Sequence, residues 1–461
     1  MSSTSTTPSG RPRKQVVLGA HLPGVNHHTL WQDPAAGSQI AVESFVHLAR
    51  TAERGFFDLF FLAEGLRLRE HAGQVYERDV VGRPDTFTVL AALAGVTDHL
   101  GLAGTINTTF NEPYELARQF ATLDHLSGGR AAWNVVTSFD AFTGENFRRG
   151  GYLERSQRYE RAEEVLLAVR ALWDSWGEDD VPADAASGRF LARPDAGRFE
   201  VGAHQFDVRG RFNVPRSPQG HPVVLQAGVS DRGREFAAAN ADAIFSPFRR
   251  LADAAPFYAD VKARAARHGR RPEDVKILPS AGVVLGDSAA DAQERARHLT
   301  HQQVDPDTAI ALAEQVWNRD LSGYDPEGPL PEVGPDAQAP PRWRGRALHE
   351  ADLVTLVQRW REVAERGGGL SLRETVIEVT ARATFVGTAT HVADAIDAFV
   401  QADGSDGFIL HPPVVPTGLD EFVDTVVPLL QERGSLRTRY TGSTLRENLG
   451  LSAARTPEPV A

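Results

Sequence analysis

The sequence predicts a (β/α)8 barrel, and three observations lead to this prediction. Short apolar runs alternate with longer segments of helical period along most of the 461 residues, a pattern typical of a parallel sheet. About eight such runs are present, and a helical segment follows all of them except the run at 277–285. Neither a G-x-G-x-x-G nor a P-loop motif stands where a strand meets a helix, so a closed barrel is favoured over an open doubly wound sheet.

The predicted strands are the short apolar runs, and the predicted helices are the longer periodic segments. In chain order the strands cover residues 16–20, 59–62, 100–105, 131–136, 223–227, 243–245, 277–285 and 408–410. The helices cover residues 40–54, 86–97, 113–126, 157–176, 232–240, 252–268 and 419–433. Pro113 fits the first turn of its helix, where its missing N–H has no intrahelical partner to lose. Gly128 and Gly129 suit the left-handed turn that ends this helix.

Two irregular stretches interrupt this series and are predicted to be insertions into a single domain that covers residues 15–451. The first, near 177–222, is rich in Gly, Pro and Asp and is expected to hold a small hairpin around 206–212. The second, near 320–346, holds most of the remaining prolines and is the expected lid over the site. The polar stretches 1–14 and 452–461 are expected to be disordered tails.

Composition excludes several classes of partner and of site. Lys and Arg number 49 against 61 Asp and Glu, so the formal charge is -12, and broad electrostatic binding to nucleic acid or to an anionic membrane is not expected. The absence of cysteine excludes disulfides, thiolate metal sites and cysteine nucleophiles. The opening segment lacks the apolar run of a signal peptide, and no stretch approaches the roughly 20 apolar residues of a membrane span. We therefore expect a cytoplasmic protein.

Small or polar residues follow six of the predicted strands, at the face where barrel enzymes place their active sites. These residues are His21, Glu64, Asn107, Thr137 with Ser138, Gly228 to Ser230, and His411. Loops are commonly polar, so each residue alone indicates little. Their coincidence at six strand ends favours a site at this face.

The segment QAGVSDRGREFAA, from Gln226 to Ala238, joins a buried strand to an Arg-bearing helix. Free backbone N–H groups and the positive end of the helix dipole would face the barrel mouth there, as binding of a phosphate monoester requires. Ser230 is equally well explained as an ordinary N-cap residue. The sequence leaves both interpretations open.

Other chemistries find weaker support. His27 and His28 are adjacent and would point to opposite sides of an extended chain, so no metal is expected. The hydrolase motif G-x-S-x-G is absent. A solvated helix face explains paired carboxylates such as Glu163 and Glu164. Most aromatic residues that flank strand ends are expected to pack in the core, although they would also suit the walls of a pocket for a planar apolar cofactor.

Longer segments carry a specific resemblance. They read LAEGLRLRE, GLAGTINTTFNEPYELARQFATLDHLSGGRAAWNVVTS, RYERAEEVLLAVRALWDSW, VLQAGVSDRGREFAAANADAIF and GFILHPPVVPTGLDEFVDTVVPLLQERGSLRTRYTGSTLRENLGL. These segments resemble the nitrilotriacetate monooxygenase branch of the bacterial luciferase-like flavin monooxygenases, which also includes the dibenzothiophene sulfone and pristinamycin synthase large components. The resemblance extends from Val16 to Leu451.

This resemblance implies a (β/α)8 barrel that takes FMNH2 from a separate NAD(P)H:flavin reductase. It further implies addition of O2 at the flavin C4a position, oxygenation of a small organic substrate, and a homodimer or homotetramer. The alternatives are an F420-dependent oxidoreductase of the same superfamily and a non-catalytic flavin-binding protein. The NEPY and LSGGR segments favour FMN over F420.

By position, the resemblance implies a flavin ring near five residues. They are Glu64, Thr105, Asn107, Asn134 and Thr137. Glu64 stands where the family usually has an aspartate, so its carboxylate is one methylene further from the backbone. The proton donor is not identified, and the candidates by chemistry are His21, His27 and His28.

The resemblance also implies a phosphate site formed by Arg155, Tyr159, Gly228, Val229 and Ser230. Arg155 stands where a histidine is usual, and Val229 where a serine is common. An arginine can bind a phosphate through two donors in a fixed fork, so the phosphate site is still expected.

Overall fold

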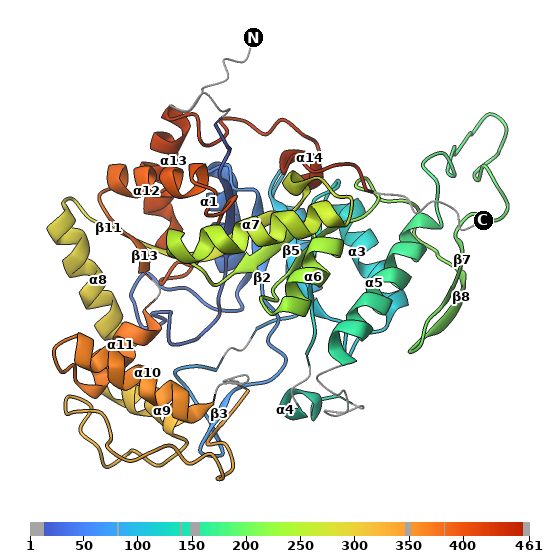
Figure 1. Cartoon of the computed structure of the whole chain (residues 1–461). Coiled ribbons are helices and arrows are strands. Elements are labelled where there is room, and N and C mark those ends of the chain that lie inside the picture. Colours follow the sequence, from blue (N-terminus) through green and yellow to red (C-terminus); the bar gives the residue numbers. More distant parts are fainter. Residues whose placement is uncertain are drawn as a thin grey trace.

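The computed structural model describes residues 13–80, 83–138, 141–147, 157–345, 352–381 and 383–454. Within them, parallel strands form a closed barrel with helices packed around it (Figure 1). The barrel strands are β1 (Val17–His21), β2 (Leu59–Leu62), β5 (Gly101–Asn107), β6 (Ala131–Val136), β9 (Val223–Gln226), β10 (Ala243–Ser246), β11 (Lys276–Leu285) and β14 (Gly407–Leu410). The pairing of β10 with β11 closes the ring, and β1 lies between β2 and β14. The predicted barrel is confirmed.

Each predicted strand coincides with one of these barrel strands. The third continues two residues beyond its expected end at residue 105, so Asn107 lies on β5 itself. The helices that surround the barrel are α1 (Val42–Arg54), α2 (Thr86–Ala94), α3 (Pro113–Leu126), α5 (Arg158–Asp174), α6 (Asp231–Asn240), α7 (Leu251–Arg267), α12 (Ala389–Gln401) and α13 (Asp420–Glu432). Short 3-10 turns, η2 (Pro272–Asp274) and η3 (Thr417–Leu419), precede β11 and α13.

Alternation along the strands decides which side chains face the barrel interior. The interior cluster includes Val17, Leu59, Phe61, Ala103, Ala132, Val223, Leu225, Ala243, Leu278 and Ile409. Two residues further along three of these strands come Thr105, Asn134 and His411, on the same inward period. The carboxyl end of the barrel is therefore polar inside, whereas its middle is apolar.

The first insertion carries an antiparallel hairpin, β7 (Arg198–Gly202) and β8 (Asp207–Arg211). It begins earlier than the expected range of 206–212. Phe199 and Phe212 from this region join a buried cluster with Trp173 of α5, which attaches the hairpin to the outer helix layer. In Figure 1 the hairpin lies at the right, away from the centre of the barrel.

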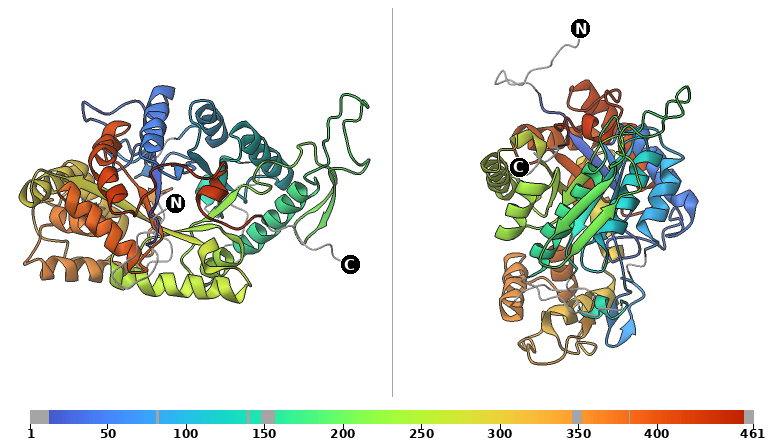
Figure 2. Two further views of the ribbon diagram at one scale, coloured as in Figure 1. Left: turned by 90° about the horizontal axis from the view of Figure 1, so that it is seen from above. Right: turned by 90° about the vertical axis from the view of Figure 1, so that its right-hand side faces the viewer.

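The second insertion is much larger than residues 320–346. It contains α8 (Ala289–Gln303), α9 (Pro306–Trp317), α10 (Leu353–Arg366), α11 (Leu372–Thr380) and β13 (Ala383–Gly387), none of which the sequence predicted. Helices α9 to α11 enclose an apolar cluster of their own around Trp317, Trp360 and Val376. They gather below the barrel in Figure 1 and in the right view of Figure 2.

Strand β13 is a ninth strand that lies beside the barrel. It pairs with the second half of the ten-residue β11, from Gly282 onward, whereas the first half of β11 pairs with β10 and β14. A change of register between Gly282 and Val283 separates the two halves.

A small sheet connects the second insertion to the loop after β2. Strand β3 (Glu70–His71) pairs with β4 (Gln74–Val75) and with β12 (Trp343–Arg344). Short helix α4 (Ala141–Gly144) lies at the same end of the molecule (Figure 1). Most of the expected lid lies instead against α9 and α10, since the carbonyl of Val333 accepts from the Trp317 indole at 3.0 Å and from Arg361 at 3.1 Å.

The amino-terminal end of the barrel is closed by a late segment of the chain. Short helix α14 (Leu445–Asn448) lies across the middle of the ring in the left view of Figure 2. Leu445, Leu449 and Leu451 enter the interior cluster from this side. We call residues 442–452 the plug.

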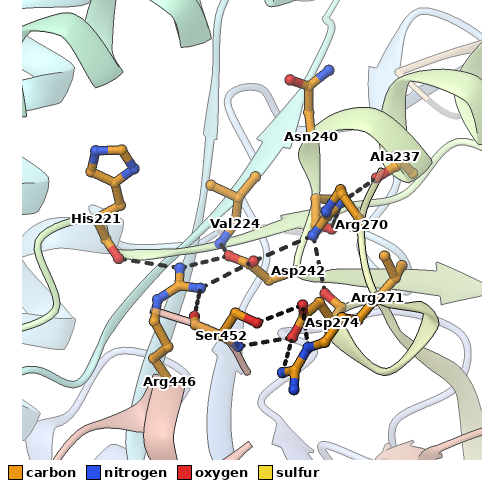
Figure 3. A network of polar contacts seen from close by, with 12 residues as sticks. His221, Val224, Ala237, Asn240, Asp242, Arg270, Arg271, Asp274, Arg446 and Ser452 are labelled. Atoms are coloured by element: carbon orange, nitrogen blue, oxygen red, sulfur yellow. Dashed lines mark hydrogen bonds and ion pairs between the residues drawn. The ribbon is translucent and has the colours of Figure 1, made fainter. Parts of the chain in front are cut away.

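Buried charges fix the plug to the barrel (Figure 3). Arg446 donates to Asp242 at 2.9 Å, and Asp242 also lies 3.6 Å from Arg270. The backbone N–H and the hydroxyl of Ser452 both donate to Asp274 at 2.8 Å. Among the described residues, no helix is long and apolar enough to cross a bilayer.

Candidate active site at the carboxyl ends of the strands

Two adjoining cavities lie at the carboxyl end of the barrel. The first, which we call the amide cavity, is lined by Phe61, Ala63, Glu64, Gly65, Leu66, Arg67, Arg69, Arg83, Thr105, Asn134, Val136, Ser138, Thr143, Ala227, Phe245 and Gly345. The second, the histidine cavity, is lined by residues that include His21, His27, His28, His411, Thr300 and Gln303. Arg69 and Arg83 line both cavities and so form a shared wall.

Glu64 and Asn107 form one hydrogen-bonded unit beside the amide cavity. The backbone N–H of Asn107 donates to Glu64 Oε2 at 3.2 Å, and its Nδ2 donates to the same oxygen at 3.0 Å. Burial raises the pKa of Glu64 to about 7, and the two hydrogen bonds from Asn107 oppose this rise. Glu64 can therefore hold or release a proton near neutral pH.

Thr105 and Asn134 form the floor of the amide cavity. Asn134 Nδ2 donates to Thr105 Oγ1 at 3.0 Å, and both side chains are buried. Oδ1 of Asn134 is also buried and has no hydrogen-bond partner in the structure. A buried acceptor without a donor is costly unless a ligand supplies one.

The turn after β9 is shaped by Gly228 and by the hydroxyl of Tyr159 on α5. The backbone N–H of Gly228 donates to Gln226 Oε1 at 2.7 Å. A Cβ on Gly228 would lie 2.6 Å from the Tyr159 hydroxyl oxygen, and one on Gly233 would lie 2.8 Å from it. Only glycine at both positions leaves room for this hydroxyl.

Ser230 is the N-cap of α6. Its hydroxyl oxygen accepts from the backbone N–H of Gly233 at 3.2 Å, and the residue is exposed. The guanidinium groups of Arg158 and Arg232 lie 5.1 Å and 5.8 Å from the centre of the Tyr159 ring. A helix N-terminus and two cations therefore surround the Tyr159 ring and its hydroxyl.

The histidine cavity brings together side chains from the first and last barrel strands. Nδ1 of His21 lies 2.8 Å from Nδ1 of His411, so one ring nitrogen donates to the other. Leu410 is paired with Ala20, and this register places the two histidines side by side. The ring of His21 also packs against Phe61, with ring centres 5.2 Å apart.

His27 and His28 reach the same cavity from the loop after β1. Their ring centres are 3.6 Å apart, and Nδ1 of His27 lies 3.4 Å from Asp79. The fully buried Asp79 also forms an ion pair with Arg69. All three histidine candidates therefore lie at one cavity, with His411 as a fourth.

The structure brings some predicted residues together and leaves others apart. Glu64, Thr105 and Asn134 line one cavity, whereas Thr137 is not among its lining residues although its neighbours Val136 and Ser138 are. Strand alternation explains this difference, because residues 134, 136 and 138 share a face. Val229 lines neither cavity: its carbonyl accepts from Arg234 at 2.8 Å, and its side chain packs against the outer apolar cluster. Arg155 lies outside the described residues.

The sequence did not reveal Arg69 and Arg83, which line both cavities. They lie in the long connection between β2 and α2, and neither follows the end of a barrel strand. His411 was found at a strand end, but no role was attached to it.

Comparison with known proteins identifies relatives of this chain. The family described as Luciferase-like monooxygenase matches residues 25–406. N-acetyl-S-(2-succino)cysteine monooxygenase of Bacillus subtilis (strain 168) is 40% identical over 445 residues, which cover 95% of this chain and 97% of that protein. Nitrilotriacetate monooxygenase component A of Aminobacter aminovorans is 39% identical, with coverage of 95% and 97%.

A solved structure has the same architecture along its whole length. That of DmoA from Hyphomicrobium sulfonivorans superimposes with a TM-score of 0.81 at 28% identity, covering 97% of this chain and 100% of that chain. The resemblance to the nitrilotriacetate monooxygenase branch is confirmed. The chain belongs to the luciferase-like monooxygenase family.

Proposed function

We propose that this protein is the oxygenating component of a two-component monooxygenase that uses FMNH2 and O2. The observation that carries the proposal is Asn134 Oδ1, a buried acceptor without a partner at a cavity that Glu64 and Thr105 also line. The N–H groups of a reduced flavin ring are donors of the kind that this oxygen lacks. Similarity to a protein named as component A of nitrilotriacetate monooxygenase supports a two-component system.

The amide cavity has the mixed character that a flavin ring requires. Phe61, Val136 and Phe245 supply apolar walls, while Glu64 and Asn134 supply polar atoms at defined positions. With a pKa near neutrality, Glu64 can donate a hydrogen bond when protonated and accept one when ionised. Asn107 holds its carboxylate in place in both states.

The phosphate would lie at the turn that carries Gly228 and Ser230. The first N–H groups of α6 and the Tyr159 hydroxyl would act as donors, and Arg158 and Arg232 would supply positive charge. Arg155 and Val229 belong to the same proposed site. Thr137 belongs to the proposed ring site, although it is not among the lining residues of the amide cavity.

Reduced flavin, when bound, supplies the electrons that activate O2 for transfer to a substrate. The chain itself holds a proton between Nδ1 of His21 and Nδ1 of His411 and keeps apolar side chains around the amide cavity to limit access of water. His27 and His28 are further proposed proton donors to the reacting centre.

We propose an NAD(P)H:flavin reductase as the source of FMNH2, a small organic substrate, a homodimer or homotetramer, and a cytoplasmic location. Residues 15–451 are proposed to act as one domain.

Anaerobic titration with FMNH2, followed by mixing with O2, tests the proposed function. The protein should bind FMNH2 more tightly than reduced F420 and should change the rate of flavin reoxidation. Asn134→Ala should weaken FMNH2 binding, whereas Asn213→Ala, at an exposed asparagine, should not. Equal reoxidation rates with and without the wild-type protein would exclude the proposed function.

A further inference from the structure

Arg83 carries a positive charge that no carboxylate of the described residues neutralises by direct contact. Its guanidinium donates to the backbone carbonyls of Glu64 at 3.1 Å and Pro23 at 2.7 Å. Its Nε is buried and has no hydrogen-bond partner among the residues that the structure describes. Buried cations are normally paired with an anion, because desolvation without a partner is costly.

The carboxylate whose charge acts on Arg83, that of Asp79, is already committed to other residues. Asp79 forms an ion pair with Arg69 and lies 3.4 Å from His27. Burial lowers the pKa of Arg83 to about 10, with a further lowering by the positive charge of Arg69, and Asp79 only partly opposes both effects. The two arginines and one aspartate leave an excess of one positive charge in the shared wall.

Among the described residues that line it, the histidine cavity has no acidic group that would balance this excess. Its lining residues include four histidines and two arginines but neither Asp nor Glu. This composition is the reverse of the chain as a whole, in which acidic residues exceed basic ones by 12. Thr300 and Gln303 of α8 add uncharged polar groups to the lining. The cavity is thus suited to a small anion.

We propose that the histidine cavity binds a carboxylate-bearing substrate and that Arg83 is the residue that recognises its negative charge. The substrate role rests on the proposed function, in which the adjoining amide cavity holds the flavin ring. None of the residues of the turn at Gly228 lines the histidine cavity. The anion bound there is therefore distinct from the flavin phosphate.

Calorimetric titration of the full chain with two probes of similar shape tests this proposal. Thiodiacetate is a small dianion, and its dimethyl ester is neutral. The wild-type protein should bind the dianion at least tenfold more tightly than the ester, about the ratio that one charge-assisted hydrogen bond provides. Equal affinities, or binding of neither probe, would overturn the proposal without the need for any variant.

Variants then locate the charge. Arg83→Gln should weaken thiodiacetate binding about tenfold or more and leave the ester unaffected, and Arg83→Lys should restore part of the loss. Arg297→Gln is the matched control, since Arg297 is 69% exposed and pairs with Glu294. An unchanged dissociation constant for thiodiacetate in Arg83→Gln would exclude this residue.

The same samples are titrated with FMNH2 in the absence of oxygen. Weaker FMNH2 binding in Arg83→Gln, with thiodiacetate binding unchanged, would assign Arg83 to the flavin and overturn the proposal. Arg83-dependent binding of thiodiacetate by a wild-type protein that does not bind FMNH2 would instead uphold the anion site and reject the proposed function.

Discussion

Asn107 donates two hydrogen bonds to a single carboxylate oxygen of Glu64, one from its backbone and one from its side chain. These bonds stabilise the ionised form, yet burial outweighs them and the pKa of Glu64 is raised to about 7. The folded protein therefore keeps a proton on this carboxyl group at pH values where the unfolded chain has lost it.

This difference predicts a pH-dependent stability. The unfolded carboxyl group loses its proton near pH 4.5 and the folded one near pH 7, so the free energy of unfolding should fall as the pH rises between these values. Relative to that of Glu64→Gln, the free energy of unfolding of the wild type should fall by about 1–3 kcal/mol across this pH range. Urea denaturation of both proteins at a series of pH values measures the change.

Asn107→Ala is a control that should shift this pH range in a known direction. It removes one of the bonds that stabilise the ionised form, so the upper end of the range should move to higher pH. A difference between wild type and Glu64→Gln that does not vary with pH would contradict the raised pKa.

Ser230→Asp should weaken FMN binding while leaving the helix intact. Aspartate is as good an N-cap as serine, so the cap of α6 is retained. Its negative charge would repel the flavin phosphate, with an expected loss of about 0.2–1 kcal/mol in binding free energy because the residue is exposed. Fluorescence titration with FMN measures this loss.

Thr388→Asp is the control for this substitution, because Thr388 caps α12 in the same way and lines neither cavity. It should bind FMN like the wild type. If Ser230→Asp also binds FMN normally, Ser230 is only a helix cap.

Gly228→Ala should displace the Tyr159 hydroxyl, since the new methyl group would lie 2.6 Å from it. The two nearest obstacles, Gln226 Nε2 and the Tyr159 hydroxyl, are ends of side chains, and the third is the backbone Cα of Gly233 at 3.1 Å. We expect the fold to survive with a loss of about 1–3 kcal/mol in stability. The affinity for FMN should fall further than stability does. In a Tyr159→Phe background the same change should cost less, because the hydroxyl is gone, and a double-mutant cycle measures this coupling. If the effects of the two substitutions are strictly additive, the Tyr159 hydroxyl does not interact with the turn at Gly228.

Arg446→Met should destabilise the barrel without changing its cavities. Burial alone would raise the pKa of Asp242, and the positive charges of Arg446 and Arg270 instead hold it below its usual range. Removal of Arg446 leaves the buried carboxylate with the more distant Arg270, at 3.6 Å, and the backbone N–H of Val224, at an expected cost of about 3–5 kcal/mol in urea denaturation.

Arg297→Met serves as the comparison for this pair. Its partner Glu294 is as exposed as Arg297 itself, so the change should cost less than about 0.5 kcal/mol. Combining Arg446→Met with Asp242→Asn should recover part of the lost stability. If Arg446→Met lowers the free energy of unfolding no more than Arg297→Met does, the buried pair of Arg446 and Asp242 does not stabilise the plug.

The barrel strands could be predicted because each is a buried apolar run. The elements between β11 and β14 could not, since they form a second layer with its own small core. Strand β13, for example, covers only five residues, and its first residue is exposed. Such a strand depends on the far half of β11 for pairing, which no local pattern indicates.

The site was predictable only where strand ends mark it. Glu64, Asn107, His21 and His411 follow or end strands, so their meeting at one face follows from the barrel itself. Arg83 has no such mark, because its position between the two cavities depends on how a long loop folds back. A charge pattern that emerges only after folding is not visible in the order of residues.

The plug leaves the ribosome later than the barrel that it closes. Residues 442–452 follow every barrel strand in the chain, so Asp242 has no Arg446 until all the barrel strands have been synthesised. A nascent chain can assemble the ring earlier, but the apolar interior at its amino-terminal end then lacks Leu445, Leu449 and Leu451 and is open to water. Fusions or truncations near this segment should therefore reduce the yield of folded protein even though they lie far from the cofactor.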